Sequence, residues 1–231
     1  MIVRMVMTKS PATVDVHDSV GLALGRMMAQ RIRRLPVVER RGKLVGILST
    51  HDVMRALPAG TNPFAAVVDC PELGDSVSTF MTDRLVTVTP DTPIEEAARL
   101  MDANKIGALP VVHRGGLVGI ITTSDLGRVV SAVMACGPRD TRICFEIEET
   151  DSAMRIVTEI AERTEVTLLG LMVVRSEPKP MGVVQLTGAG ADDFVDGFWS
   201  AGCRVFSVLR AGAELLADDS AVPLQTPSAT D

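Results

Sequence analysis

One ten-residue segment occurs twice in the chain, and this internal duplication constrains the fold more than any other feature. Leu44–Val53 reads LVGILSTHDV and Leu117–Leu126 reads LVGIITTSDL, with six of the ten positions identical. Upstream, Met7–Val38 matches Met81–Val112 with twelve identities in 32 positions. Similarity at a fixed spacing is typical of a duplicated structural unit. The first part of the chain is therefore predicted to contain two copies of one fold.

The two copies are predicted to span residues 1–57 and 76–135, joined by a linker at 58–75. Each is expected to have the order β-α-β-β-α. Asp18 is the expected cap of the first helix, and Thr92 with Glu95 is predicted to form a capping box in the second copy. The apolar stripe of the first helix is predicted to comprise Val20, Ala23, Leu24, Met27 and Met28.

The last third of the chain shows no third copy, and its pattern predicts a different domain at residues 141–210. Alternating strand-like and helix-like segments predict the order βαββαβ, a ferredoxin-like arrangement. The expected elements are Arg142–Ile147, Asp151–Arg163, Val166–Val174, Met181–Thr187, Ala191–Ala201 and Cys203–Leu209. Residues 211–231 are small, acidic and interrupted by proline, and we expect a disordered tail there. The fold class is α/β (α+β).

Composition excludes several classes of function. A net charge of −6 argues against binding to nucleic acid, which needs a basic surface. No apolar stretch approaches the roughly 18 residues of a membrane span, and we expect no membrane association. The cysteines are scattered without metal-ligand spacing and predict reduced, mostly buried thiols in a cytoplasmic protein; they are Cys70, Cys136, Cys144 and Cys203. The histidines, also without such spacing, are predicted to be surface residues; they are His17, His51 and His113.

The duplicated unit resembles the cystathionine-β-synthase (CBS) domain, which occurs as tandem pairs called Bateman modules. The first copy carries the likeness in Met7-Thr8, Leu35–Val38 and Gly46-Ile47-Leu48-Ser49-x-x-Asp52. The second copy carries it in Met81-Thr82, Leu109–Val112 and Gly119-Ile120-Ile121-Thr122-x-x-Asp125. The last third resembles an ACT domain by topology alone. The combined order is similar to the acetoin utilisation proteins of bacteria.

The resemblance implies two clefts that bind adenosine-containing ligands between the repeats. Serine or threonine and the aspartate of each Ser/Thr-x-x-Asp motif would meet phosphate and ribose, and the opposite repeat would cup the base. In the first cleft these residues are Ser49, Asp52, Val86 and Ile106; in the second they are Thr122, Asp125, Ala12 and Ile32.

Arginines are expected to distinguish the two clefts. Arg34 matches a phosphate-contacting arginine of the family, and Arg33 lies beside it, whereas the second copy has Gly107 and Ala108 at these positions. The cleft of Asp52 is therefore predicted to bind the more phosphorylated ligand.

The same motif also has a purely structural interpretation. Ser/Thr-x-x-Asp before an apolar helix is an ordinary capping motif. An ionised carboxylate also suits a ribose diol, since it accepts two charge-assisted hydrogen bonds. The two roles are compatible, so the motif is expected both to cap the helix and to bind the ligand.

The function that we expect is regulatory: a homodimer that senses AMP, ADP, ATP or S-adenosylmethionine and acts on a protein partner. No covalently bound cofactor, metal site or catalytic residue is expected, because no nucleophile, metal cluster or positioned base is evident. The alternatives are a structural dimer with vestigial clefts and a nucleotide-processing enzyme. In the ACT-like domain the turn at Glu148–Ser152 lacks the glycine of an amino-acid site, which favours association by sheet pairing.

Overall fold

The computed structural model describes residues 1–39, 42–56, 74–147, 150–175 and 179–210. Residues 40–41, nearly all of the linker and the tail at 211–231 lie outside these residues. The chain divides into two compact units, Met1–Val133 and Met134–Asp231.

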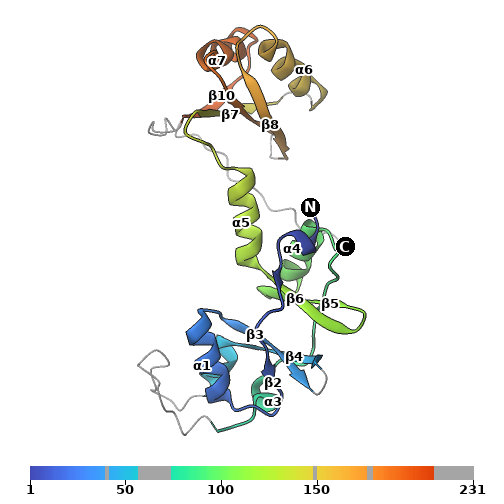
Figure 1. Ribbon diagram of the computed structural model, residues 1–231. Coiled ribbons are helices and arrows are strands. Elements are labelled where there is room, and N and C mark those ends of the chain that lie inside the picture. The colour runs from blue at the N-terminus through green and yellow to red at the C-terminus, as the bar shows by residue number, and fades with distance from the viewer. Residues whose placement is uncertain (40–41, 57–73, 148–149, 176–178, 211–231) are drawn as a thin grey trace. The chain divides into compact units, whose positions relative to one another are not determined.

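Two three-stranded sheets with flanking helices form the first unit (Figure 1). One has the strand order β2-β3-β4 and the other the order β1-β6-β5. The first half comprises β2 (Val14–Asp15), α1 (Val20–Gln30), β3 (Arg34–Glu39), β4 (Lys43–Ser49) and α2 (Thr50–Ala56). The second comprises α4 (Ile94–Ala103), β5 (Ala108–His113), β6 (Gly116–Thr122) and α5 (Thr123–Val133). The expected order is found, except that the first strand of the second copy is reduced to one parallel bridge between Val88 and Val111.

The repeats exchange their N-terminal segments. Helix η1 (Val3–Met5) and strand β1 (Thr8–Lys9) belong to the first repeat but pack on the second: Val3 is fully buried in the core of the second half, and Thr8 pairs with Ile120 of β6. Helix α3 (Val77–Phe80) contributes Val77 to the core of the first half. The two packed halves therefore do not coincide with the two sequence repeats.

The repeated glycine of Leu-Val-Gly-Ile makes room for this exchange. A Cβ atom on Gly46 would lie 2.5 Å from Met81 Sδ and 3.2 Å from the Thr82 carbonyl oxygen. A Cβ atom on Gly119 would lie 2.6 Å from Met7 Sδ and 3.0 Å from the Thr8 carbonyl oxygen. The Met-Thr pair of each repeat thus packs on the glycine of the other, which explains why both motifs are duplicated together.

Three local predictions about the helices are wrong. Ser19, not Asp18, caps α1, because Ser19 Oγ accepts a hydrogen bond from Leu22 N at 3.2 Å while Asp18 turns back to Asp15 N. In the second copy Thr92 Oγ1 accepts from Thr89 N instead of capping α4, so the capping box does not form. Met28 is 42% exposed, since the buried stripe of α1 ends at Met27.

The second unit has the predicted βαββαβ order. Its antiparallel sheet has the order β10-β7-β9-β8 (Figure 1). The buried rings of Phe145 and Phe194 each pack against the ring of Phe198 in a tilted arrangement in its core, with ring centroids 4.6 and 5.3 Å apart. The elements are β7 (Asp140–Glu146), α6 (Thr150–Ala161), β8 (Thr167–Val174), β9 (Met181–Thr187), α7 (Ala191–Ser200) and β10 (Val205–Arg210).

Candidate functional site

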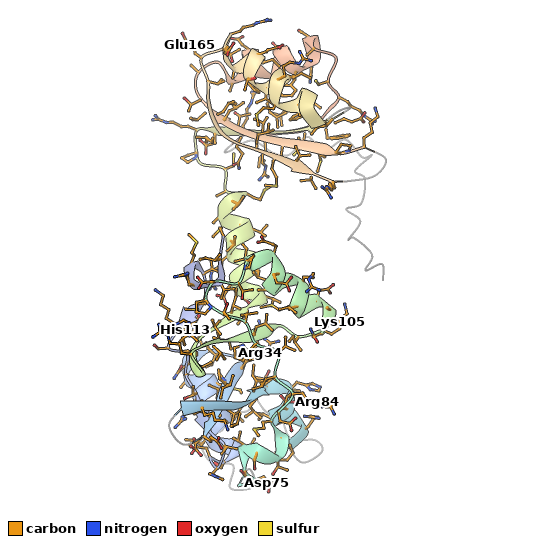
Figure 2. All side chains as sticks on the ribbon, turned by 90° about the vertical axis from the view of Figure 1, so that its right-hand side faces the viewer. Arg34, Asp75, Arg84, Lys105, His113 and Glu165 are labelled. Carbon is orange, nitrogen blue, oxygen red and sulfur yellow. The ribbon has the colours of Figure 1, made fainter. Side chains whose placement is uncertain are left out.

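A cleft of about 230 Å³ lies beside Asp52, and we call it the Asp52 cleft. Ser49 and Asp52 line it from the end of β4 and the start of α2, while Val86 and Ile106 come from the opposite repeat. Figure 2 labels three of its cations. The remaining lining residues are Arg34, Ile47, Thr82, Arg84, Leu85, Lys105, Gly107, Ala108 and Pro110.

The Asp125 cleft, of about 290 Å³, is the counterpart in the other repeat. Thr122 and Asp125 line it from the end of β6 and the start of α5, and Ala12 and Ile32 come from the opposite repeat. Both volumes are at or just below the small end of the range for small-molecule sites. The remaining lining residues are Thr8, Pro11, Gln30, Arg31, Arg33, Arg34, Ile120, Ser124 and Arg128.

In each cleft the aspartate completes the start of a helix. Asp52 Oδ2 accepts hydrogen bonds from Ser49 N at 2.8 Å and Ser49 Oγ at 2.6 Å, and Ser49 Oγ accepts from Asp52 N at 3.3 Å. Thr122 and Asp125 make the same set of bonds. The structural interpretation of the motif is therefore realised, and one carboxylate oxygen of each aspartate is fully used by it.

The second oxygen of each aspartate meets an arginine three residues later. Arg55 Nη2 lies 2.8 Å from Asp52 Oδ1, and Arg128 forms the equivalent ion pair with Asp125 Oδ1. Sequence reasoning missed these arginines, although Ser/Thr-x-x-Asp-x-x-Arg is present in both repeats. The aspartates are buried, while the arginine side chains are 58% and 70% exposed. Each pair can therefore open toward solvent without moving the carboxylate.

The expected partition of the arginines is wrong. Arg33 lines the Asp125 cleft, and Arg34 lines both clefts. More arginines therefore line the Asp125 cleft than the Asp52 cleft. Both Arg33 and Arg34 therefore lie at the Asp125 cleft, and of the two only Arg34 also lines the Asp52 cleft to which the pair was assigned. The arginine-free second cleft inferred from Gly107 and Ala108 does not exist, because those residues line the Asp52 cleft.

The Asp52 cleft has cations that sequence reasoning did not assign to it. Arg84 follows the Met-Thr segment, and Lys105 precedes Ile106. Lys105 is paired with Asp102 at 2.8 Å, and both side chains are more than 80% exposed. In the part of the chain that the structure describes, no carboxylate pairs with Arg31, Arg33, Arg34 or Arg84. Both clefts thus present unneutralised positive charge.

None of the histidines and cysteines that the structure describes lines either cleft. His17, His51 and His113 are exposed, as predicted. Cys136, Cys144 and Cys203 are half-buried rather than buried, and Cys70 lies outside the described residues. Among the described residues no group of histidine, cysteine, aspartate or glutamate is arranged to hold a metal ion, and no helix there is long and apolar enough to cross a bilayer.

The CBS domain model matches residues 3–59 and 77–132. A CBS domain-containing protein of Dictyostelium discoideum is 34% identical over 131 residues, which are 54% of this chain and 88% of that protein. The chain belongs to the CBS domain family, and its first unit is a tandem CBS pair. Proteins with such pairs are generally regulatory.

Solved structures with the same pair include a protein of Vibrio cholerae provisionally assigned to acetoin utilization, with a TM-score of 0.50 and 30% identity over 58% of this chain and 93% of that one. Another is the CBS pair of protein MJ0100 in complex with 5'-methylthioadenosine and S-adenosyl-L-methionine, with a TM-score of 0.50 and 27% identity over 58% of this chain and 98% of that one.

Enzymes are also among the relatives. The inosine-5'-monophosphate dehydrogenase of Methanocaldococcus jannaschii is 35% identical over 150 residues, 58% of this chain but 27% of the enzyme. A homoserine O-acetyltransferase of Methanococcoides burtonii matches over 23% of its length. Because the chain spans only about a quarter of each enzyme, these matches give no positive sign of enzymatic activity here.

Proposed function

We propose that the CBS pair binds an adenosine-containing ligand in the Asp52 and Asp125 clefts and that the protein is regulatory. One observation carries the proposal: each cleft joins a buried carboxylate at a helix start, apolar residues of the opposite repeat and guanidinium groups that have no acidic partner among the described residues. These three features suit ribose, base and phosphate in turn.

The carboxylate is the proposed ribose contact. Oδ2 of Asp52 or Asp125 is held by the helix cap, which fixes the orientation of the group, and Oδ1 meets only an exposed arginine. A ribose hydroxyl that donates to Oδ1 gains a charge-assisted hydrogen bond. The cap therefore orients the carboxylate for binding, and the same two residues serve stability and recognition.

The base and the phosphates would lie on either side of the ribose. Val86 with Ile106, and Ala12 with Ile32, are half-buried and give each cleft an apolar wall from the opposite repeat. Arginine forks match phosphate geometry. Ser49 and Thr122 would contact the phosphate, next to the carboxylate that would bind the ribose.

The ligand class is an adenosine derivative. The two ligands of MJ0100 share the adenosine moiety, which supports adenosine as the recognised part. AMP, ADP, ATP and S-adenosylmethionine are the candidates, and none is expected to be covalently attached. The guanidinium groups that lack an acidic partner in the described part of the chain favour the phosphorylated members.

A thermal-shift panel with these four ligands and adenosine tests the proposal, since a ligand that binds only the native state raises the melting temperature by mass action. Asp52→Asn and Asp125→Asn should each reduce the shift, and the double variant should abolish it. Ser19→Ala is the matched control: it removes a helix cap outside both clefts, at a cost of about 1 kcal/mol, and should keep the full ligand shift.

Two outcomes would replace the proposal. No shift with any ligand would favour a structural dimer with vestigial clefts. Turnover of a nucleotide by the purified protein, lost in Asp52→Asn or Asp125→Asn, would make the protein an enzyme.

The second unit is proposed to be an ACT-type domain that associates with a second copy, within a cytoplasmic homodimer. Its support is the βαββαβ order and the antiparallel sheet order β10-β7-β9-β8. Closed twofold association is the commonest arrangement of oligomers. A monomer mass by light scattering at micromolar concentration would contradict the dimer.

A further inference from the structure

We propose that Arg34 is shared between the two clefts, so that a phosphorylated ligand in one cleft weakens the binding of a phosphorylated ligand in the other. The inference rests on the proposed function and adds a regulatory property to it. Its basis is the position of one side chain between two sites.

Arg34 lies at the border of the clefts. It is the first residue of β3 and pairs in register with Ser49 at the end of β4, so its backbone is beside the Asp52 cleft. Its guanidinium lies against Gly107 of the other repeat, where a Cβ atom would be 2.5 Å from Arg34 Nη2. Arg34 also lines the Asp125 cleft. One residue, labelled in Figure 2, therefore borders both sites.

The guanidinium has no counterion among the described residues. Arg34 is half-buried, and that burial, together with the neighbouring charge of Arg33, lowers its pKa. Arginine nevertheless stays protonated at neutral pH. A partly desolvated cation beside a second cation is stabilised by an anion, and a ligand phosphate in either cleft would provide one.

The surroundings of the two clefts are unequal. The Asp125 cleft adds Arg31 and Arg33 to the shared residue, both without an acidic partner in the described chain. The Asp52 cleft adds Arg84, and Lys105 is already paired with Asp102. A polyphosphate should therefore bind first in the Asp125 cleft. The Arg34 side chain then binds this polyphosphate, moves away from Gly107 and no longer contributes to the Asp52 cleft.

Calorimetry on the full chain measures the coupling. Asp52→Asn and Asp125→Asn each weaken one cleft, so that the affinity of the other is obtained alone. The wild type is then titrated with ATP, and the weaker of its two steps is compared with the affinity of the isolated Asp52 cleft. Because Arg34 can make its charge-assisted contact in only one cleft at a time, the second ATP molecule should bind about tenfold more weakly than ATP binds to the isolated Asp52 cleft. Adenosine, which has no phosphate, should bind the two clefts independently.

Arg34→Ala should abolish the coupling and leave two independent ATP sites. Arg84→Ala is the matched control, because it removes an unpaired guanidinium that lines the Asp52 cleft but not the Asp125 cleft. It should weaken ATP binding in the Asp52 cleft and keep the coupling ratio.

Independent ATP sites in the wild type, or coupling that persists in Arg34→Ala, would overturn the inference while leaving the proposed function intact. Failure of the wild type to bind adenosine or ATP would overturn both. Coupling of equal size with adenosine would also refute the role of Arg34, since no phosphate would be involved.

Discussion

Gly107→Ala should displace Arg34 without damaging the fold. The new Cβ atom would lie 2.5 Å from Arg34 Nη2 and 3.1 Å from Cζ, well inside van der Waals contact. The guanidinium is the far end of a flexible side chain, so it moves while the backbone stays. Gly107 is not among the residues with positive φ, and alanine fits its backbone. We expect a small change in melting temperature and an Arg34 side chain pushed away from the Asp52 cleft.

The magnitude follows from the lost contact. A hydrogen bond between a guanidinium and a phosphate contributes about 1.5–3 kcal/mol, so ATP should bind the Asp52 cleft about ten- to a hundredfold more weakly. Adenosine binding should be unchanged. The affinities are measured by calorimetry in an Asp125→Asn background, which leaves the Asp52 cleft as the tighter site.

Gly25→Ala is the control, because a Cβ atom at Gly25 in α1 meets nothing within 4 Å. It should leave both affinities unchanged. Unchanged ATP affinity in Gly107→Ala, or an equal loss for ATP and adenosine, would refute the assignment of Arg34 to phosphate in this cleft.

Three further predictions concern the fold. Val3→Ala should lower the free energy of unfolding by about 1–3 kcal/mol in urea titrations, because the exchanged N-terminal segment buries Val3 completely; Val130→Ala, at a site 61% exposed, should change it by less than about 0.5 kcal/mol. Gly182→Ala should cost about 1–3 kcal/mol, since its Cβ atom would lie 2.4 Å from the ring of Phe145, whereas Gly170→Ala meets nothing within 4 Å; equal effects would contradict this packing. Burial, and secondarily the carboxylate of Asp140, raises the pKa of the Cys136 thiol. The rate of alkylation of Cys136, measured by peptide mass spectrometry, should therefore increase over a higher pH range than the rate for N-acetylcysteine.

The duplication made the first unit predictable. Patterns that act over a few residues, such as the Leu-Pro-Val-Val and Leu-Val-Gly-Ile strands and the Ser/Thr-x-x-Asp helix starts, gave the order of elements nearly in full. The order of the second unit followed from its alternating strand-like and helix-like segments. These features are local, and local periodicity is visible in a sequence.

The errors arose where partners are distant. The N-terminal segment that contains Val3 packs on the other repeat. It does so through contacts between residues far apart in the sequence, such as Thr8 with Ile120. Arg33 and Arg34 were both assigned to the Asp52 cleft, although both line the Asp125 cleft and only Arg34 also lines the Asp52 cleft; each cleft is built from both repeats, and this arrangement is not visible in a local sequence pattern. The cap at Thr92 failed because its hydroxyl had a competing partner, Thr89 N.

The central claim is that both clefts bind adenosine, and equilibrium dialysis with radiolabelled adenosine tests it most directly. At ligand concentrations that saturate the wild type, we expect two adenosine molecules to bind per wild-type chain. Asp52→Asn and Asp125→Asn should each bind one, and the double variant should bind none. Ser19→Ala should still bind two adenosine molecules per chain. Absence of saturable binding to the wild type, or undiminished binding to the double variant, would contradict the account.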